Sequence, residues 1–125
     1  MANSTLPTVT VVIPVHNEAA FLPEALPRLF EELATVDADV TVVIAENGST
    51  DATADLVRKA MSTYSNLDVL ELPTPDYGAA MRDGFLRADT QWVANFDIDY
   101  FSGEFLTNAL ALSEVADIVL ASKRA

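Results

Sequence analysis

The chain has 125 residues, a length typical of one domain, and half of its residues are hydrophobic, which predicts a packed core and excludes a disordered protein. It contains no cysteine, so disulfides, thiolate nucleophiles and zinc-thiolate sites are excluded. The 19 acidic residues against 7 basic ones give a formal net charge of -12, which argues against nucleic acid as a partner.

Two further properties bear on location and on phosphate-bearing ligands. No apolar run reaches the length needed to span a bilayer, and residues 1–8 lack the basic and apolar regions of a signal peptide, so we expect a cytoplasmic protein. The acidic balance would repel a ligand that carries phosphate. A divalent cation held by carboxylates would remove this obstacle, because the ion inverts the local charge.

Strands and helices are predicted to alternate along the chain. A β-branched run at 9–15 predicts a central strand, and leucines with Phe30 follow it at helical spacing. The later predicted elements are a strand at 40–45, a helix at 52–61, a strand at 67–72, a helix at 79–88, a buried strand at 92–96, a helix at 105–115 and a strand at 118–121. This alternation predicts an α/β fold, a mostly parallel sheet between two helical layers, in a single domain that spans 1–125.

Polar residues follow three of the predicted strands at the edge where such sheets bind ligands. The three clusters are 14–18 (PVHNE), 46–51 (ENGSTD) and 97–99 (DID). Each cluster also has a purely structural interpretation. Residues 47–48 fit a tight turn, and Ser49 or Thr50 fits a helix N-cap. Residues 17–18 fit the start of a helix.

Asp97 and Asp99 end an apolar strand and are separated by one residue. If residues 97–99 stay extended, both side chains point to the same side, because strand side chains alternate with a period of two. Two carboxylates at this place suit Mg²⁺ or Mn²⁺, which bridge proteins to phosphates. Asp-x-Asp also occurs by chance in many loops, so the neighbouring clusters add weight to the metal hypothesis.

Two other side chains near these clusters have alternative roles. His16, the sole histidine, fits a loop residue better than a catalytic base, because the sequence supplies no orienting partner for it. Arg82 is the one cation near the clusters and is a candidate partner for a phosphate, although a surface arginine fits it equally well.

Four motifs, in this order, resemble those of the family 2 glycosyltransferases. They are 11–18 (VVIPVHNE), 46–53 (ENGSTDAT), 77–85 (YGAAMRDGF) and 97–99 (DID). The resemblance covers almost the whole chain and is nearest to polyprenyl-phosphate sugar synthases such as dolichyl-phosphate mannose synthase. It implies a GT-A nucleotide-diphospho-sugar fold and transfer of a sugar from a UDP- or GDP-sugar to an acceptor, which is polyprenyl phosphate in that subgroup.

The resemblance also implies, position by position, which residues form the donor site. The nucleotide-binding residues would be Pro14, Asn17, Glu18, Glu46, Asn47, Arg82 and Asp97. Asp97 and Asp99 would form the pair that holds Mg²⁺ or Mn²⁺ on the donor diphosphate. The catalytic base is not assigned, because family members supply it from a later part of their chains.

The chain departs from the family pattern in two respects. Glu46 and Asn47 stand where the family usually has two aspartates, which leaves the preferred base open. Family members also continue into a half that recognises the acceptor and inserts a strand between the fourth and fifth strands. We therefore expect this chain to form a homo-oligomer through exposed sheet edges, and we expect membrane association only in a longer form.

Two alternative functions fit parts of the sequence. A module that binds a nucleotide or nucleotide-sugar without transferring anything would account for the missing acceptor half. A phosphoacceptor receiver domain has a similar size and alternation, with a lysine, here Lys123, near its last strand. That class needs an acidic cluster after the first strand and an aspartate after the third, where this chain has 17–18 (NE) and 70–73 (LELP).

Overall fold

The computed structural model describes residues 5–113 and confirms the predicted alternation of strands and helices. The elements are β1 (Thr8–Val15), α1 (Leu22–Ala34), β2 (Asp39–Asn47), α2 (Thr53–Ala60), β3 (Leu67–Leu72), α3 (Tyr77–Arg87), β4 (Trp92–Asn95) and α4 (Gly103–Leu112). The predicted strand at 118–121 and the end of the predicted helix at 105–115 lie outside the described residues. In the described part, no helix is long and apolar enough to cross a bilayer.

The strands form a parallel sheet in the order β3-β2-β1-β4. Its register pairs Val11 of β1 with Val42 of β2 and with Ala94 of β4. The first three strands are added in one direction, and β4 then pairs with the other side of β1. The strand order therefore reverses at β1, and α/β sheets bind ligands beyond the carboxyl ends of the strands at such a point.

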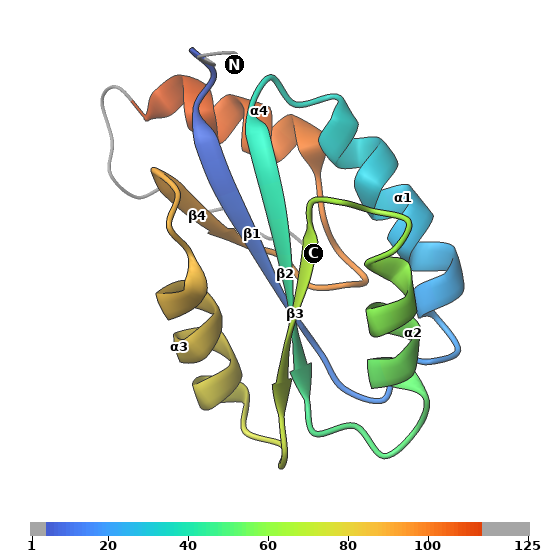
Figure 1. Cartoon of the computed structure of the whole chain (residues 1–125). Helices are drawn as coiled ribbons and strands as arrows, with labels where there is room; N and C mark the ends of the chain where they lie inside the picture. Colours follow the sequence, from blue (N-terminus) through green and yellow to red (C-terminus); the bar gives the residue numbers. More distant parts are fainter. Residues whose placement is uncertain (1–4, 114–125) are drawn as a thin grey trace, which may run out of the picture.

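Helices cover both faces of the sheet, which makes the predicted three layers (Figure 1). α1, α2 and α4 lie on one side, where alternate residues of β1, such as Val9, Val11 and Ile13, are fully buried in the main core with Leu22 and Leu29 of α1. α3 lies on the other side, because the next residues of β1 point that way.

α3 packs unusually close to β1. Gly84 of α3 is buried, and a Cβ atom at this position would lie 2.5 Å from Cγ1 of Val12. A helix can approach a sheet this closely where the residue at the contact lacks a side chain. The glycine thereby brings the start of α3 to the same edge of the sheet as the ends of β1 and β2.

The strand predicted at 92–96 is present as β4, but the prediction that it is buried is wrong. Val93 and Asn95 are exposed, and Trp92 and Ala94 are half-buried. In the described part of the chain, β4 lies at the edge of the sheet and pairs with β1. An apolar run does not tell a central strand from an edge strand, because both can carry hydrophobic side chains.

Candidate functional site

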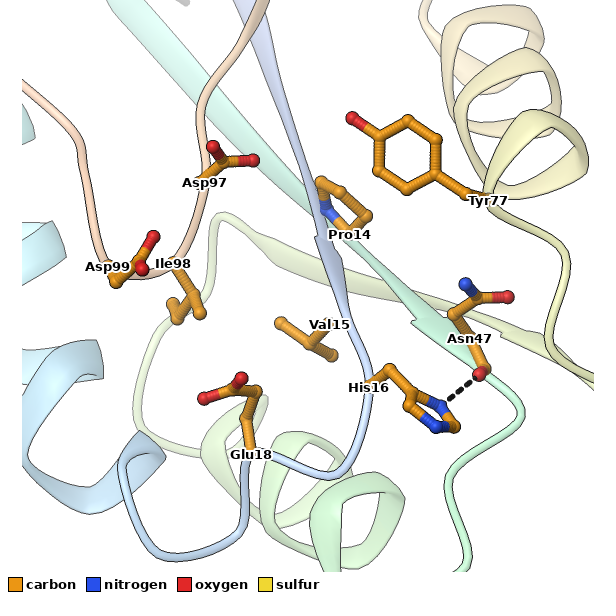
Figure 2. Close-up of a pocket in the computed structure, with 9 residues that line it drawn as sticks. All are labelled: Pro14, Val15, His16, Glu18, Asn47, Tyr77, Asp97, Ile98 and Asp99. Atoms are coloured by element: carbon orange, nitrogen blue, oxygen red, sulfur yellow. Dashed lines mark hydrogen bonds between the residues drawn. The ribbon is translucent and has the colours of Figure 1, made fainter.

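A pocket of about 300 Å³ opens at the carboxyl edge of the sheet, where the segments after β1, β2 and β4 meet the start of α3 (Figure 2). It is lined by Pro14, Val15, His16, Glu18, Asn47, Tyr77, Asp97, Ile98 and Asp99. Three of these side chains are carboxylates, and no lysine or arginine is among the described residues that line the pocket. The carboxylates disfavour a negatively charged ligand that brings no cation.

Asp97 and Asp99 both line the pocket, although their segment is not extended as we supposed. The backbone N–H of Tyr100 donates to the carbonyl oxygen of Asp97 at 3.0 Å and closes a turn. Ile98, between the two aspartates, is 5% exposed and belongs to the main core. This buried side chain anchors the turn, so both neighbouring carboxylates stay at the surface of the pocket.

The aspartate pair fits a divalent ion that is shared with a ligand. Within the described residues, no group of three or more His, Cys, Asp or Glu side chains is placed to hold a metal, so the protein supplies few ligands. Mg²⁺ is commonly held by one or two carboxylates and completes its shell with substrate phosphates and water. Among the described residues, no donor forms a hydrogen bond to the side-chain carboxylate of either aspartate; the bond from Tyr100 ends on the backbone oxygen of Asp97.

The loops after β1 and β2 are joined by hydrogen bonds. The backbone N–H of Asn17 donates to Oγ of Ser49 at 2.9 Å, and the backbone N–H of Thr50 donates to Oδ1 of Asn17 at 2.9 Å. Asn17 has a positive φ of 52°, a conformation that asparagine adopts more readily than most residues. Its side chain therefore holds the two loops together and does not line the pocket.

Glu46 also serves the loop structure. It is 3% exposed, and its Oε2 accepts a hydrogen bond from the backbone N–H of Ser49 at 2.8 Å. This bond closes the turn after β2 from within. Glu46 is not one of the residues that line the pocket, and its predicted contact with the nucleotide stays a prediction.

Asn47 is held at two of its oxygen atoms. Nδ1 of His16 lies 2.7 Å from the backbone oxygen of Asn47, and the backbone N–H of Asp76 donates to Oδ1 of Asn47 at 2.6 Å. The next residue, Gly48, has a φ of 61°, and a Cβ atom there would lie 2.5 Å from the backbone nitrogen of Pro75. Asn47 is thus fixed between three segments and is 7% exposed.

A third set of contacts fixes Glu18. Its backbone N–H donates to Oγ1 of Thr53 at 2.9 Å, and Thr53 is fully buried. The Thr53 hydroxyl and backbone N–H both donate to Oδ1 of Asp51, and the hydroxyl bond is the chief reason why the pKa of Asp51 lies below its ordinary value. Asp51 in turn accepts from the backbone N–H of Ala19 at 3.3 Å.

Arg82 lies away from the pocket lining. Its Nε is 3.1 Å from Oδ1 of Asp83, and its side chain is 67% exposed. An ion pair this exposed contributes little to stability and leaves the guanidinium free to change partner. Its predicted contact with a phosphate stays a prediction.

The pocket thus brings together five of the predicted residues: Pro14, Glu18, Asn47, Asp97 and Asp99. Tyr77 was not among the predicted site residues, but it starts α3 and lines the pocket with a side chain that is 57% exposed. Its place at the start of the motif 77–85, after the third predicted strand, was the available signal. His16 lines the pocket as well and is also a loop residue, as expected.

Comparison with known proteins gives a family match over most of the chain. Residues 10–121 match the model of glycosyl transferase family 2. An undecaprenyl-phosphate 4-deoxy-4-formamido-L-arabinose transferase of Aeromonas hydrophila is 34% identical over 101 residues, which are 79% of this chain and 31% of that protein. An uncharacterised glycosyltransferase of Mycobacterium bovis is 32% identical over 93% of this chain and 49% of its own length.

Solved structures show the same architecture. TarS of S. aureus, determined in complex with UDP-GlcNAc, matches with a TM-score of 0.67 and 28% identity, over 86% of this chain and 31% of that chain. This likeness agrees with the predicted α/β fold of the GT-A class. The chain spans about a third of the length of the Aeromonas relative and of TarS.

Proposed function

Because the chain belongs to glycosyl transferase family 2, we propose that it is the donor-binding part of a glycosyltransferase. In this proposal it binds a nucleoside-diphosphate sugar whose sugar is transferred to an acceptor. The observation that carries the proposal is the convergence of Asp97, Asp99 and Asn47 on one pocket at the point where the strand order reverses.

The aspartate side of the pocket would hold the diphosphate. Asp97 and Asp99 would hold Mg²⁺ or Mn²⁺, and the ion would offset the negative charge of the diphosphate. When bound, the ion stabilises the negative charge that develops on the leaving nucleoside diphosphate. The two carboxylates position the diphosphate, and Glu18 adds a third negative charge that disfavours anions without a metal.

The remaining side of the pocket would hold the nucleoside. Pro14 and Asn47, with Tyr77, form this side, while Asn17 and Glu46 accept hydrogen bonds from backbone N–H groups of the loop after β2. UDP is the first nucleotide to test, because TarS has been determined with UDP and with UDP-GlcNAc. GDP is the alternative that the sequence motifs leave open.

The acceptor in this proposal is a polyprenyl phosphate, by analogy with the undecaprenyl-phosphate transferases among the relatives. Reaction would then take place at a membrane surface, with the domain itself on the cytoplasmic side. Self-association through exposed sheet edges is a further expectation. Light scattering at micromolar concentration tests it, and a monomer would contradict it.

Calorimetric titration with UDP and with GDP, each with and without Mn²⁺, tests the proposed function. We expect one nucleotide to bind in the presence of Mn²⁺, and we expect this binding to be lost in Asp99→Ala. Absence of binding to either nucleotide would contradict the proposal. Metal-dependent binding without transfer to polyprenyl phosphate by the complete protein would favour the alternative of a binding module.

A further inference from the structure

The amide of Asn47 has a defined orientation, because one of its atoms faces an unambiguous donor. A backbone N–H can only donate, so the atom that lies 2.6 Å from the nitrogen of Asp76 must be the carbonyl oxygen of the Asn47 side chain. The opposite assignment of oxygen and nitrogen would place two donors against each other. The NH₂ group therefore occupies the other position.

This NH₂ group points into the pocket. Figure 2 shows the side-chain nitrogen of Asn47 directed toward the space beside Pro14 and Tyr77. Asn47 is 7% exposed, and within the described part of the chain no group accepts a hydrogen bond from this nitrogen. Among the described residues, no fully buried side-chain nitrogen or oxygen lacks a partner, so the Asn47 nitrogen is reachable from the pocket. Its N–H groups can therefore donate to a ligand there.

The position of Asn47 relative to the aspartates matches the length of a nucleotide. Asn47 ends β2, and Asp97 follows β4, with β1 between these two strands. Two strand spacings separate the ends of β2 and β4, roughly 10 Å. A ribose bridges such a gap between a diphosphate at the aspartates and a base beside Asn47.

We propose that Asn47 selects donors whose base presents a carbonyl oxygen, such as uracil, against bases that present an amino group at the same position. The proposal rests on the proposed function, because it assumes that a nucleotide occupies this pocket. Uracil carries a carbonyl oxygen at position 4, where cytosine carries an amino group, and the same contrast separates guanine from adenine. The Asn47 NH₂ group donates to the oxygen and opposes the amino group.

The selection follows from Asp76 as much as from Asn47. A free asparagine amide could rotate and accept from cytosine, so by itself it would not discriminate. Here the backbone N–H of Asp76 holds the oxygen, while the His16 contact holds the backbone of the same residue. The asparagine is thereby restricted to its role as a donor.

The test compares UDP with CDP, which have similar size and charge, by calorimetric titration in Mn²⁺. We expect the wild-type chain to bind UDP at least about tenfold more tightly than CDP, since a site built around one hydrogen-bond polarity rejects the opposite one. In Asn47→Asp, one carboxylate oxygen keeps the bond from Asp76 and the other becomes an acceptor. The ratio of the two affinities should then shift toward CDP by about tenfold or more.

Asn108→Asp is the matched control, because it makes the same chemical change at an exposed position of α4. It should leave both affinities and their ratio unchanged. If Asn47→Asp does not fold by circular dichroism, Asn47→Ala serves in its place and should bring the ratio close to one, since the discriminating donor is removed.

The outcomes separate the inference from the proposed function. If the wild-type chain binds UDP and CDP equally in Mn²⁺, or if the substitution at Asn47 leaves the wild-type ratio of the two affinities unchanged, the inference is overturned while the donor site stands. If the wild-type chain binds neither nucleotide, the proposed function fails and the inference fails with it.

Discussion

The loops after β1 and β2 are joined to each other, whereas the segment after β4 is closed by a turn of its own. Asn17, Ser49 and Thr50 tie the first two loops, and Asn47 adds contacts to His16 and to Asp76. In the third segment, the backbone N–H of Tyr100 donates to the carbonyl oxygen of Asp97. The two sides of the pocket are therefore held by different means.

This difference indicates a division of roles between the two sides. On the side of β1 and β2, Asn17, Ser49 and the Asn47 side-chain oxygen form hydrogen bonds within the protein, so the pocket wall is organised before a ligand arrives. On the side of β4, the aspartates keep their oxygens available. A site arranged in this way would recognise the nucleoside by a fixed surface and the diphosphate through an ion that arrives with it.

The largest expected effect comes from removing charge on the aspartate side. Asp97→Asn and Asp99→Asn each keep the shape of the side chain and should lower Mn²⁺-dependent UDP affinity by at least about 100-fold. Even the loss of a residue that only orients a metal ligand costs about 10–100-fold in metal affinity. Calorimetry measures the effect. Asp37→Asn, at an exposed loop position, is the control. Binding that is unchanged in both aspartate variants would show that the metal lies elsewhere.

The next effect concerns the fixed side of the pocket. Gly48→Ala should destabilise the fold by about 1–3 kcal/mol, because Gly48 has a φ of 61° and a Cβ atom there would lie 2.5 Å from the Pro75 nitrogen. Urea denaturation measures it. Gly78→Ala is the control: the nearest atom to a Cβ there is Oδ1 of Asp76 at 3.6 Å. A helical alanine should be neutral or stabilising by up to about 1 kcal/mol. Equal stability of the two variants would contradict this account of the turn.

A smaller effect is expected at Tyr77. Substituting it tests whether a residue can strengthen nucleotide binding without selecting the base. Stacking of a base on an aromatic ring contributes about 1–3 kcal/mol, and we expect the lower end of this range because Tyr77 is 57% exposed. Tyr77→Ala should weaken UDP and CDP binding alike and leave their ratio unchanged, because every base has an aromatic face. A changed ratio in the calorimetric comparison would assign base selection to Tyr77 as well.

The smallest expected effect is on the acid dependence of stability. The pKa of Asp51 is lowered in the folded protein, chiefly by the Thr53 hydroxyl, so the unfolded chain takes up the proton first as the pH falls. The stabilisation is complete above the ordinary value of 3.8 and is lost as the pH falls through the folded pKa. Between about pH 6 and pH 3, the wild-type protein should therefore lose more stability in urea denaturation than Asp51→Asn. Parallel profiles for the two proteins would contradict this role of Asp51.

The sequence predicted the elements well where hydrophobic periodicity is strong. The run at 9–15 and the leucines after it became β1 and α1, because buried strands and amphipathic helices have distinct spacings. The prediction that β4 is buried was wrong, because an apolar run does not show whether a strand pairs with one neighbouring strand or with two. The turn at Asp97 was missed for a similar reason: Ile98 packs into the core, and the sequence does not show tertiary contacts of this kind.

The sequence predicted where the candidate site lies, but it predicted fewer of the contacts that each side chain makes there. Strand ends indicated the correct edge of the sheet, and Asp97, Asp99 and Asn47 all lie there. The sequence could not tell that Asn17 and Glu46 bond to backbone N–H groups of neighbouring loops, because a polar side chain suits a ligand and a loop equally well. Only the arrangement in space separates the two uses.

The central claim is that the aspartate pair binds a metal ion together with the nucleotide diphosphate. The most direct test follows free Mn²⁺ by electron paramagnetic resonance while the chain is titrated, once without UDP and once with saturating UDP. We predict weak Mn²⁺ binding without the nucleotide and much tighter binding with it, beyond the affinity of UDP for Mn²⁺ in solution. Mn²⁺ binding of equal strength with and without UDP would contradict the account.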